Sequence, residues 1–265
     1  MTMGAPPKNR YFLQSLAKGL NAIQKFVEAA RPITISELAQ TMNTTNTTAT
    51  RICYTLSEMG FIRKNKRKEY RLTPKILTLG YPAVCMLEWQ EIARYYLEQL
   101  LDEVQESVSL SIRNEGEILY IIRITRREYL PFDLPIGARL PVYATAMGKV
   151  LMALGPPEKT IPLIEKLKFR RLTAHTIGTK DRFLKEMDKV KRLGYGTNDE
   201  ELSLGGRALG APIVDQHGFA VAAINIGVPT TRYSMKDMEK RLVGPILRTA
   251  VKISESLQRI EAETG

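Results

Sequence analysis

One stretch of this chain, residues 34–72, constrains the fold more than any other. It begins with Thr34-Ile35-Ser36-Glu37, in which a hydroxyl residue precedes a glutamate by three positions. This spacing is typical of a capping box, where each side chain hydrogen-bonds to the other residue's backbone N–H at the start of a helix. We therefore predict a helix that begins here and ends at Asn43, a residue that tolerates left-handed backbone angles. Its buried positions are Ile35, Leu38, Ala39 and Met42.

A second helix is predicted directly after this turn, capped by Thr45 or a neighbouring threonine. Apolar residues recur at helical spacing and mark its buried face: Ala49, Ile52, Cys53, Leu56 and Met59. The opposite face carries short hydroxyls and one guanidinium: Thr47, Thr48, Arg51, Tyr54 and Thr55. Such side chains suit hydrogen bonding to phosphates and to base edges in a major groove. The alternative is a threonine-rich surface that faces only solvent.

A basic hairpin is predicted after the second helix. Phe61-Ile62-Arg63 and Tyr70-Arg71-Leu72 have the composition of two short strands, and the segment between them carries Lys64, Lys66, Arg67 and Lys68. A charge run is usually a solvated loop. After two helices joined by a tight turn, however, it lies where the wing of a winged helix-turn-helix contacts phosphates. The whole stretch therefore predicts DNA binding.

The location of the net charge agrees with this prediction. Residues 1–80 contain 13 Lys and Arg against 4 Asp and Glu, a net charge of +9, whereas residues 81–265 contain 26 against 24, a net charge of +2. A basic module joined to a nearly neutral one is what a DNA-binding domain attached to a sensing domain gives. Composition alone fits a solvated basic surface equally well.

Two further helices flank this stretch in our prediction. Upstream, a helix from Ser15 ends before Arg31-Pro32, and downstream Thr73-Pro74 starts a helix that we expect Gly80-Tyr81-Pro82 to end. The apolar face of the upstream helix consists of Leu16, Leu20, Ile23, Val27 and Ala30.

The rest of the chain predicts an α+β domain. Val108, Leu110 and Ile112 alternate with Ser107, Ser109 and Ser111, the pattern of a strand with one buried and one exposed face. Further strands are predicted at 118–124, 130–134, 208–214 and 220–227, and helices at 88–104, 145–154, 158–166, 182–193 and 235–260.

Cysteine, histidine and motif content argue against several kinds of chemistry. Cys53 and Cys85 are too few for a disulfide framework and lack zinc-ligand spacing, and we expect Cys53 to be core packing. His175 and His217 have no nucleophile motif nearby, and the chain contains no Gly-rich phosphate loop or nucleophile elbow. We expect no catalytic residue, no metal ligand and no cofactor. The alternative is a small-molecule enzyme or carrier domain with a basic surface.

The acidic run Asp199-Glu200-Glu201 is the one cluster that suggests acid/base or metal chemistry. Three consecutive side chains in a strand cannot converge on one point, so we interpret the run as a turn or a structural ion pair. The chain also lacks an uninterrupted apolar stretch of about 18 residues and an N-terminal apolar segment of the signal-peptide kind. We therefore expect a cytoplasmic protein without membrane contact.

These motifs resemble the IclR family of bacterial transcriptional regulators from about residue 12 to 260. The matching segments lie in the family's order: Gln14-Ser15-Leu16-Ala17-Lys18-Gly19-Leu20, Ser36-Glu37-Leu38-Ala39, Thr48 with Arg51, Leu56 and Gly60-Phe61, Tyr70-Arg71-Leu72-Thr73, Gly137-Ala138-Arg139-Leu140-Pro141, Ala144-Thr145-Ala146-Met147-Gly148-Lys149, Asp199-Glu200-Glu201 and Ala211-Pro212-Ile213. Segments 11–16 and 143–148 are similar to the branch that regulates aromatic-acid catabolism, the protocatechuate and 4-hydroxybenzoate regulators of the β-ketoadipate pathway. Two positions depart from the family: Asn43 replaces Gly, and Thr44 replaces an apolar residue.

The resemblance implies a winged helix-turn-helix domain at 1–73, a linker helix at 74–87 and a GAF-like α/β domain at 88–265 that binds an effector and oligomerises. It implies a ligand-responsive regulator of a catabolic operon, which forms a homodimer or a dimer of dimers. The implied partners are double-stranded operator DNA and a small carboxylic acid, with an aromatic acid favoured; RNA polymerase is a further candidate.

Two sets of site residues follow. DNA contacts are predicted from both helices and the hairpin: Ser36, Thr45, Thr47, Thr48, Arg51, Tyr54, Lys64, Lys66, Arg67 and Lys68. For the effector, Thr145 is a good N-cap, so the free N–H groups of the helix that it starts suit a carboxylate. By resemblance, the effector-binding residues are Ala146 and Met147 through their backbone, Asn198, Ala208 and Asn225, with Phe132, Leu140 and Tyr143 as apolar walls.

Overall fold

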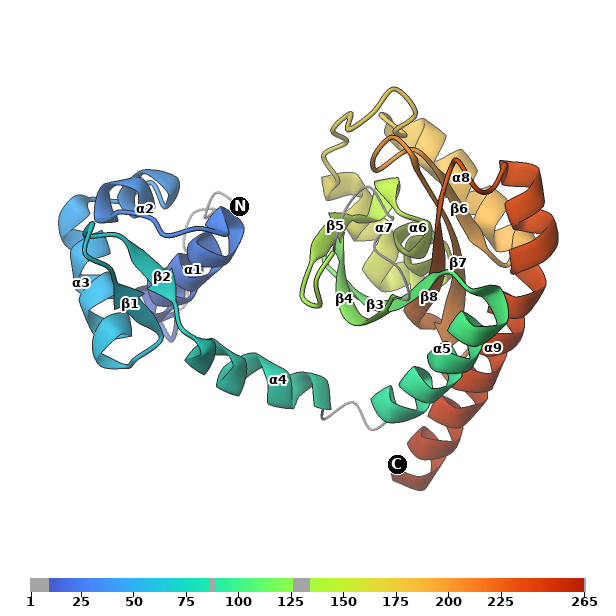
Figure 1. Ribbon diagram of the computed structural model, residues 1–265, viewed down its shortest axis with the longest axis horizontal. Coiled ribbons are helices and arrows are strands. Elements are labelled where there is room, and N and C mark those ends of the chain that lie inside the picture. Colours follow the sequence, from blue (N-terminus) through green and yellow to red (C-terminus); the bar gives the residue numbers. More distant parts are fainter. Residues whose placement is uncertain (1–9, 86–88, 126–133, 265) are drawn as a thin grey trace. The chain divides into compact units, whose positions relative to one another are not determined.

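The computed structural model describes residues 10–85, 89–125 and 134–264 (Figure 1). The chain divides into two compact units, residues 1–86 and 87–265. Along the described ranges, no helix combines the length and the apolarity that a bilayer crossing needs.

The N-terminal unit contains the predicted order of helix, turn, helix and hairpin. Its elements are α1 (Gln14–Ala29), α2 (Ile35–Thr41), α3 (Asn46–Glu58) and the antiparallel strands β1 (Ile62–Lys64) and β2 (Tyr70–Leu72). The capping box is confirmed: Glu37 N–H donates to Thr34 Oγ1 at 3.3 Å, and Thr34 N–H donates to the Glu37 carboxylate at 2.7 Å. Asn43 has a φ of 49°, the left-handed conformation predicted for the turn.

One face of each helix forms the core of this unit. Cys53 is 1% exposed, as predicted, and burial raises the pKa of its thiol to about 11, so the thiol is neutral at physiological pH. The other buried core residues include Ala22, Phe26, Leu38, Ala39, Ala49 and Leu56.

The apolar face predicted for α1 is wrong except at Ile23, which is half-buried and packs against the core. Leu16, Leu20 and Val27 are 54–59% exposed, whereas Ala22 and Phe26 face the core. The helix has apolar residues on two faces, and the small Ala22 side chain gives close packing on the core side. Met59 near the end of α3 was also predicted to be buried and is 51% exposed.

The helix after β2 is longer than predicted. A 3-10 turn, η1 (Pro74–Ile76), leads into α4 (Leu77–Cys85), which continues through Pro82 instead of ending there. Proline removes one backbone N–H donor, and the loss of one hydrogen bond is not sufficient to end this helix.

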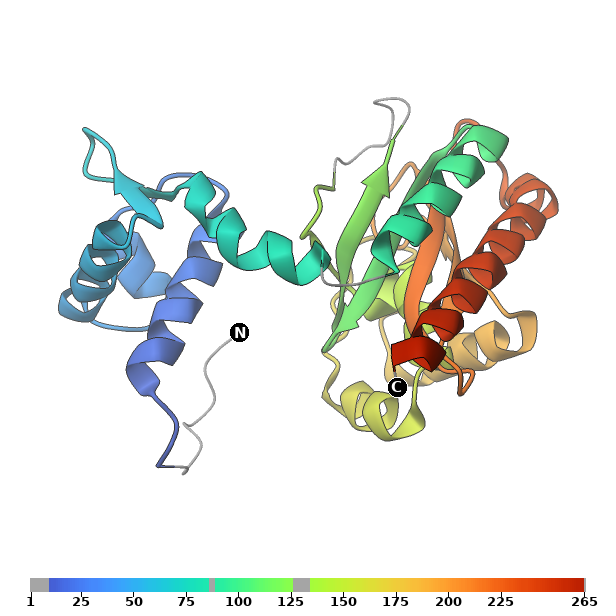
Figure 2. The same ribbon diagram turned by 90° about the horizontal axis from the view of Figure 1, so that it is seen from below.

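The C-terminal unit is a six-stranded antiparallel sheet with helices on both faces (Figure 2). The strand order is β5-β4-β3-β8-β7-β6. Helices α5 and α9 cover one face, and α6 covers the other with α7 and α8 outside it (Figures 1 and 2). The strands are β3 (Ser107–Asn114), β4 (Glu117–Ile124), β5 (Arg139–Pro141), β6 (Gly196–Asp199), β7 (Gly206–Val214) and β8 (Ala220–Pro229). The helices are α5 (Gln90–Val104), η2 (Val142–Ala144), α6 (Ala146–Leu154), α7 (Pro157–Lys166), α8 (Lys180–Leu193) and α9 (Met235–Thr264).

Most predicted elements of this unit are confirmed within a few residues. The short strands β5 and β6 were not predicted, and the strand predicted at 130–134 lies almost entirely outside the described residues. Strand β3 differs in burial, because its serine face was predicted to be exposed. Ser109 is 2% exposed and Ser111 is fully buried, since α6 lies over this face. The hydroxyl of Ser111 donates to Met147 Sδ of α6 at 3.2 Å.

Candidate nucleic-acid interface and effector site

Helix α3 presents a polar face to solvent. Its N-terminus is capped by Thr45, whose Oγ1 accepts from Thr48 N–H at 3.2 Å. Because Ala49, Cys53 and Leu56 occupy the core side, the residues at 47, 51 and 54 lie on the exposed side. Tyr54 is 66% exposed. The face therefore combines hydroxyls, a phenol and a guanidinium, all of which donate hydrogen bonds.

The β1–β2 hairpin forms a basic wing whose turn is held by the side chain of Asn65. Asn65 Oδ1 accepts from the N–H groups of Arg67 at 2.9 Å and Glu69 at 3.0 Å. Lys68 takes a left-handed φ of 61° at the turn. Lys64 Nζ lies 5.6 Å from the centroid of the Tyr70 ring, a cation–π contact at the base of the wing.

The ten residues predicted to contact DNA are therefore accessible. All are exposed except Thr48, which is half-buried. Ser36 lies at the start of α2, whereas the others lie on α3, at its cap and on the wing.

Beside α3, a groove of about 680 Å³ separates it from α1. The groove is mostly apolar, and the exposed side chains of Leu16, Leu20 and Met59 line it. Its apolar lining includes Leu16, Leu20, Ile23, Ile52, Met59 and Leu79.

In the C-terminal unit, two glycines let the N-terminus of α6 lie directly on the sheet. A Cβ at Gly210 of β7 would lie 2.8 Å from the carbonyl carbon of Ala146 and 2.9 Å from Met147 N. A Cβ at Gly196 of β6 would lie 2.7 Å from the Ala146 carbonyl oxygen. Thr145 caps the helix by accepting from Gly148 N–H at 3.1 Å, as its sequence position predicts. The N–H groups of Ala146 and Met147 belong to the first turn, which has no intrahelical acceptors.

Two asparagines lie next to this helix end. Asn198 of β6 is 5% exposed, donates to the Ala144 carbonyl at 2.6 Å and accepts from Glu201 N–H at 3.1 Å. Asn225 of β8 pairs with Gly210, and its Oδ1 is buried without a hydrogen-bond partner among the described residues. A buried acceptor of this kind is expected to have a partner, so Asn225 is a candidate ligand contact.

Five of the eight predicted effector residues therefore lie together: Ala146, Met147, Asn198, Ala208 and Asn225. Tyr143 belongs to the core instead; its hydroxyl accepts from Arg170 N–H at 2.9 Å and its ring lies 5.0 Å from the Phe169 ring. Leu140 lies on β5, at the opposite edge of the sheet from β6. Phe132 lies outside the described residues.

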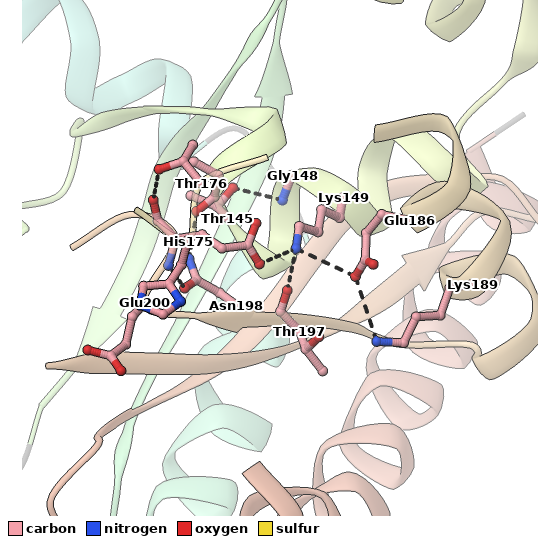
Figure 3. A network of polar contacts seen from close by, with 12 residues as sticks. Thr145, Gly148, Lys149, His175, Thr176, Glu186, Lys189, Thr197, Asn198 and Glu200 are labelled. Atoms are coloured by element: carbon pink, nitrogen blue, oxygen red, sulfur yellow. Dashed lines mark hydrogen bonds and ion pairs between the residues drawn. The ribbon is translucent and has the colours of Figure 1, made fainter. Parts of the chain in front are cut away.

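Sequence analysis missed a buried lysine behind this site (Figure 3). Lys149 of α6 is 1% exposed, and its Nζ donates to Glu201 Oε1 at 2.5 Å and to the Thr197 carbonyl at 2.8 Å. Glu186 of α8 lies 3.5 Å from the same nitrogen. Burial raises the pKa of Glu201, although the charge of Lys149 opposes this shift. The only sequence signal was one lysine in the otherwise apolar run of α6.

The acidic run forms structural ion pairs, which agrees with its interpretation. Asp199 Oδ1 lies 2.6 Å from Arg207 Nε, and Glu201 binds Lys149. Within the described ranges, no three His, Cys, Asp or Glu side chains are grouped so that they could hold a metal ion.

The winged helix-turn-helix and the separate sheet domain define the class of DNA-binding transcriptional regulators that carry a second, C-terminal domain. Residues 15–66 match the model of the IclR helix-turn-helix domain, and residues 83–255 match the model of the bacterial transcriptional regulator IclR C-terminal domain. The chain therefore belongs to the IclR family of bacterial transcriptional regulators.

Individual relatives agree with this assignment. The HTH-type transcriptional regulator KdgR of Dickeya chrysanthemi is 30% identical over 92% of this chain and 80% of its own length. The Pca regulon regulatory protein of Pseudomonas putida is also 30% identical, over 90% of this chain and 82% of its own length. A crystal structure of a transcriptional regulator from Rhodococcus sp. RHA1 gives a TM-score of 0.79, with 36% identity over 94% of this chain and 100% of that one. The first two relatives match equally well, so identity does not separate the branches of the family.

Proposed function

We propose that this protein controls a catabolic operon by binding operator DNA through its N-terminal domain and a small aromatic carboxylic acid through its C-terminal domain. The observation that carries the DNA-binding half is the exposed polar face of α3 followed directly by the basic wing. In this proposal residues 1–73 bind DNA, residues 74–87 form the linker and residues 88–265 bind the effector.

Each part of the DNA-binding face has its own role. Arg51 binds a base edge in the major groove, where a guanidinium pairs with guanine through two hydrogen bonds. Thr47 and Tyr54 contact the neighbouring bases or phosphates. The wing cations Lys66, Arg67 and Lys68 contact phosphates, which contributes affinity without sequence preference.

A gel-shift titration of operator DNA with the full chain tests these roles. Arg51→Ala should weaken binding by about 1–3 kcal/mol and relax specificity at one base pair. Replacing all three wing cations with glutamine should instead lower the slope of log affinity against log salt by about 2–3. Lys25→Ala on α1 is a matched control, because it removes a charge that already pairs with Glu28 at 2.6 Å. An Arg51→Ala protein that binds as tightly as Lys25→Ala contradicts the assignment of the α3 face.

The effector half rests on the N-terminus of α6 and its neighbours. A carboxylate placed before Ala146 and Met147 would accept from first-turn N–H groups and lie at the positive end of the helix dipole. The unpartnered Oδ1 of Asn225 would accept from a donor on the ligand. An aromatic acid is proposed because segments 11–16 and 143–148 are similar to the aromatic-acid branch; the KdgR and Pca regulon relatives, which are equally identical to this chain, do not decide between effectors.

Thermal unfolding in the presence of 4-hydroxybenzoate, protocatechuate and small keto acids tests the effector. A ligand that binds the folded state raises the unfolding temperature by mass action. We expect an aromatic acid to do so, and Asn225→Leu to abolish this shift while the unliganded protein still folds. A shift that persists in Asn225→Leu would place the ligand elsewhere.

The effector acts by linkage: it changes DNA affinity only as far as it binds the DNA-competent and DNA-incompetent arrangements differently. We propose that a second copy of the chain packs on the exposed leucines of α1, Leu16 and Leu20, and that this leaves the two α3 helices free to bind symmetry-related half-sites. Leu16→Glu with Leu20→Glu should shift the sedimentation of the protein toward the monomer. Unchanged sedimentation would mean that the copies associate through another surface.

A further inference from the structure

A positively charged residue, Arg123 of β4, lies on the face of the sheet that α6 covers. Strand register aligns four residues in one row: Arg123 of β4 with Ser109 of β3, Ser109 with Asn225 of β8, and Asn225 with Gly210 of β7. Residues directly opposite one another in neighbouring strands point to the same face of a sheet. At Gly210 the row meets the first turn of α6, which packs against this glycine and against Gly196, its partner in β6.

The contact of Ser111 with Met147 shows which face this is. Ser109 and Ser111 are two positions apart in β3 and share a face, and Ser111 touches α6. Arg123 therefore lies on the α6 side. Its positive charge also lowers the pKa of the buried Tyr120 phenol, although burial is the larger effect and raises that pKa to about 12. Tyr120 belongs to the core cluster under α6, so this agrees with the register.

A break in the strand register explains how Arg123 reaches this side. Tyr120 pairs with Ser111, but Ile122 pairs with Leu110, so Ile121 is an extra residue at a β-bulge. Without it, the alternation of side chains would place Tyr120 and Arg123 on opposite faces. The bulge directs a half-buried guanidinium onto the same face as the asparagine that the effector proposal uses.

The row has the composition of a site for an anion. It offers a guanidinium, the hydroxyl of the 2%-exposed Ser109 and the amide of Asn225, and its far end meets backbone N–H groups. A guanidinium binds a carboxylate through two parallel hydrogen bonds. Strands are about 4.8 Å apart, so Arg123 and Gly210 are separated by about 14 Å at their Cα atoms. This distance accommodates the arginine side chain together with a ligand about as long as a substituted benzene ring.

We propose that Arg123 is a second anion-binding residue of the effector site, and that the effector is a dicarboxylic acid. This inference rests on the proposed function: one carboxylate binds at the start of α6, and the other binds Arg123 with Ser109 beside it. Arg123 thereby selects diacids over monoacids of the same shape.

Isothermal titration calorimetry on the full chain tests this with two matched pairs of probes, terephthalate with 4-methylbenzoate and adipate with hexanoate. A charged hydrogen bond contributes about 1.5–3 kcal/mol, so at least one diacid should bind roughly tenfold or more tightly than its monoacid. Arg123→Met should reduce this ratio to about one, because the diacid loses the partner of its second carboxylate and is weakened much more than the monoacid. Arg123→Lys should retain part of the ratio, because it keeps the charge without the planar fork.

Arg113→Met is the control for charge and folding. Arg113 is also half-buried and lies on β3 four residues from Ser109, about 13 Å along the strand. The Arg113→Met substitution removes the same charge, and the variant should keep the preference for diacids. If the monoacids bind and the diacids bind no more tightly, or if the preference for diacids survives Arg123→Met, the role of Arg123 is overturned. The proposed function is not affected by either result. If none of the four acids binds while 4-hydroxybenzoate or protocatechuate raises the unfolding temperature, the dicarboxylic effector is overturned and the proposed function stands.

Discussion

Helix α3 and strand β3 each carry a row of small hydroxyl residues, and the two rows have opposite fates. On α3, Thr47 is exposed and belongs to a polar face on the protein surface, where a partner can bind it. On β3, Ser109 and Ser111 are buried beneath α6. The residue types are similar, and the covering element makes the difference. A row of hydroxyl residues can therefore lie either on an exposed binding surface or in the buried layer between a sheet and a helix.

The largest test of this contrast concerns the polar contacts that hold α6 in place. Lys149→Met should destabilise the C-terminal unit by about 3–5 kcal/mol, because it leaves the buried carboxylate of Glu201 without its cation. The measurement is urea unfolding followed by the fluorescence of Trp89, the chain's single tryptophan, which lies at the start of α5. An exposed charge pair would give less than 1 kcal/mol.

The pH dependence of this variant identifies the cause. Burial raises the pKa of Glu201 above its ordinary value of 4.5, so the folded state binds the proton more tightly than the unfolded state does. Stability then falls as the pH rises above 4.5, and the defect of Lys149→Met should be larger at pH 8 than at pH 5. Lys149→Met with Glu201→Gln should recover part of the loss. A defect of the same size at both pH values would indicate lost packing instead.

A matched pair of substitutions compares the two hydroxyl rows directly. Ser111→Leu should destabilise the protein by about 1–3 kcal/mol, because it adds volume where the Ser111 hydroxyl already contacts Met147 of α6. Thr47→Leu should change stability by less than about 0.5 kcal/mol and should weaken operator binding. Thermal unfolding and gel shifts of both variants measure this. Equal stability of the two variants would remove the contrast.

The smallest effect is expected at the capping box, which supports α3 without contacting DNA. Thr34→Ala should destabilise α2 by about 1 kcal/mol, measured as faster amide hydrogen exchange in that helix. The backbone N–H of Thr34, together with Arg31, lowers the pKa of Glu37 to about 2. Its stabilising contribution is therefore present above pH 4.5 and is lost as the pH falls from 4.5 toward 2. Glu37→Gln should remove that part of the acid sensitivity; exchange rates that still rise over this range would assign it to another group.

Local patterns were sufficient for much of the fold. The capping box of Thr34 and Glu37, the turn at Asn43 and the wing all depend on neighbouring residues, and the sequence predicts them. What failed depends on tertiary packing. Nothing in the alternation of β3 indicates that α6 covers its serines, and the two apolar faces of α1 do not indicate which one meets the core. The bulge at Ile121 changes the side to which Arg123 points, and such a register shift has no clear sequence signature.

The length of the strands has a further consequence, for the solubility of the protein. The central strands of the sheet have eight to ten residues, but its outermost strands, β5 and β6, have only three and four. Unpaired edge strands are templates for aggregation, and short edges limit the length over which a foreign strand can add. Pro141 further removes one N–H donor from β5. The sheet is therefore poorly suited to adding strands from another molecule at its edges. When copies of this chain associate, contacts between side chains are favoured over backbone hydrogen bonds between strands.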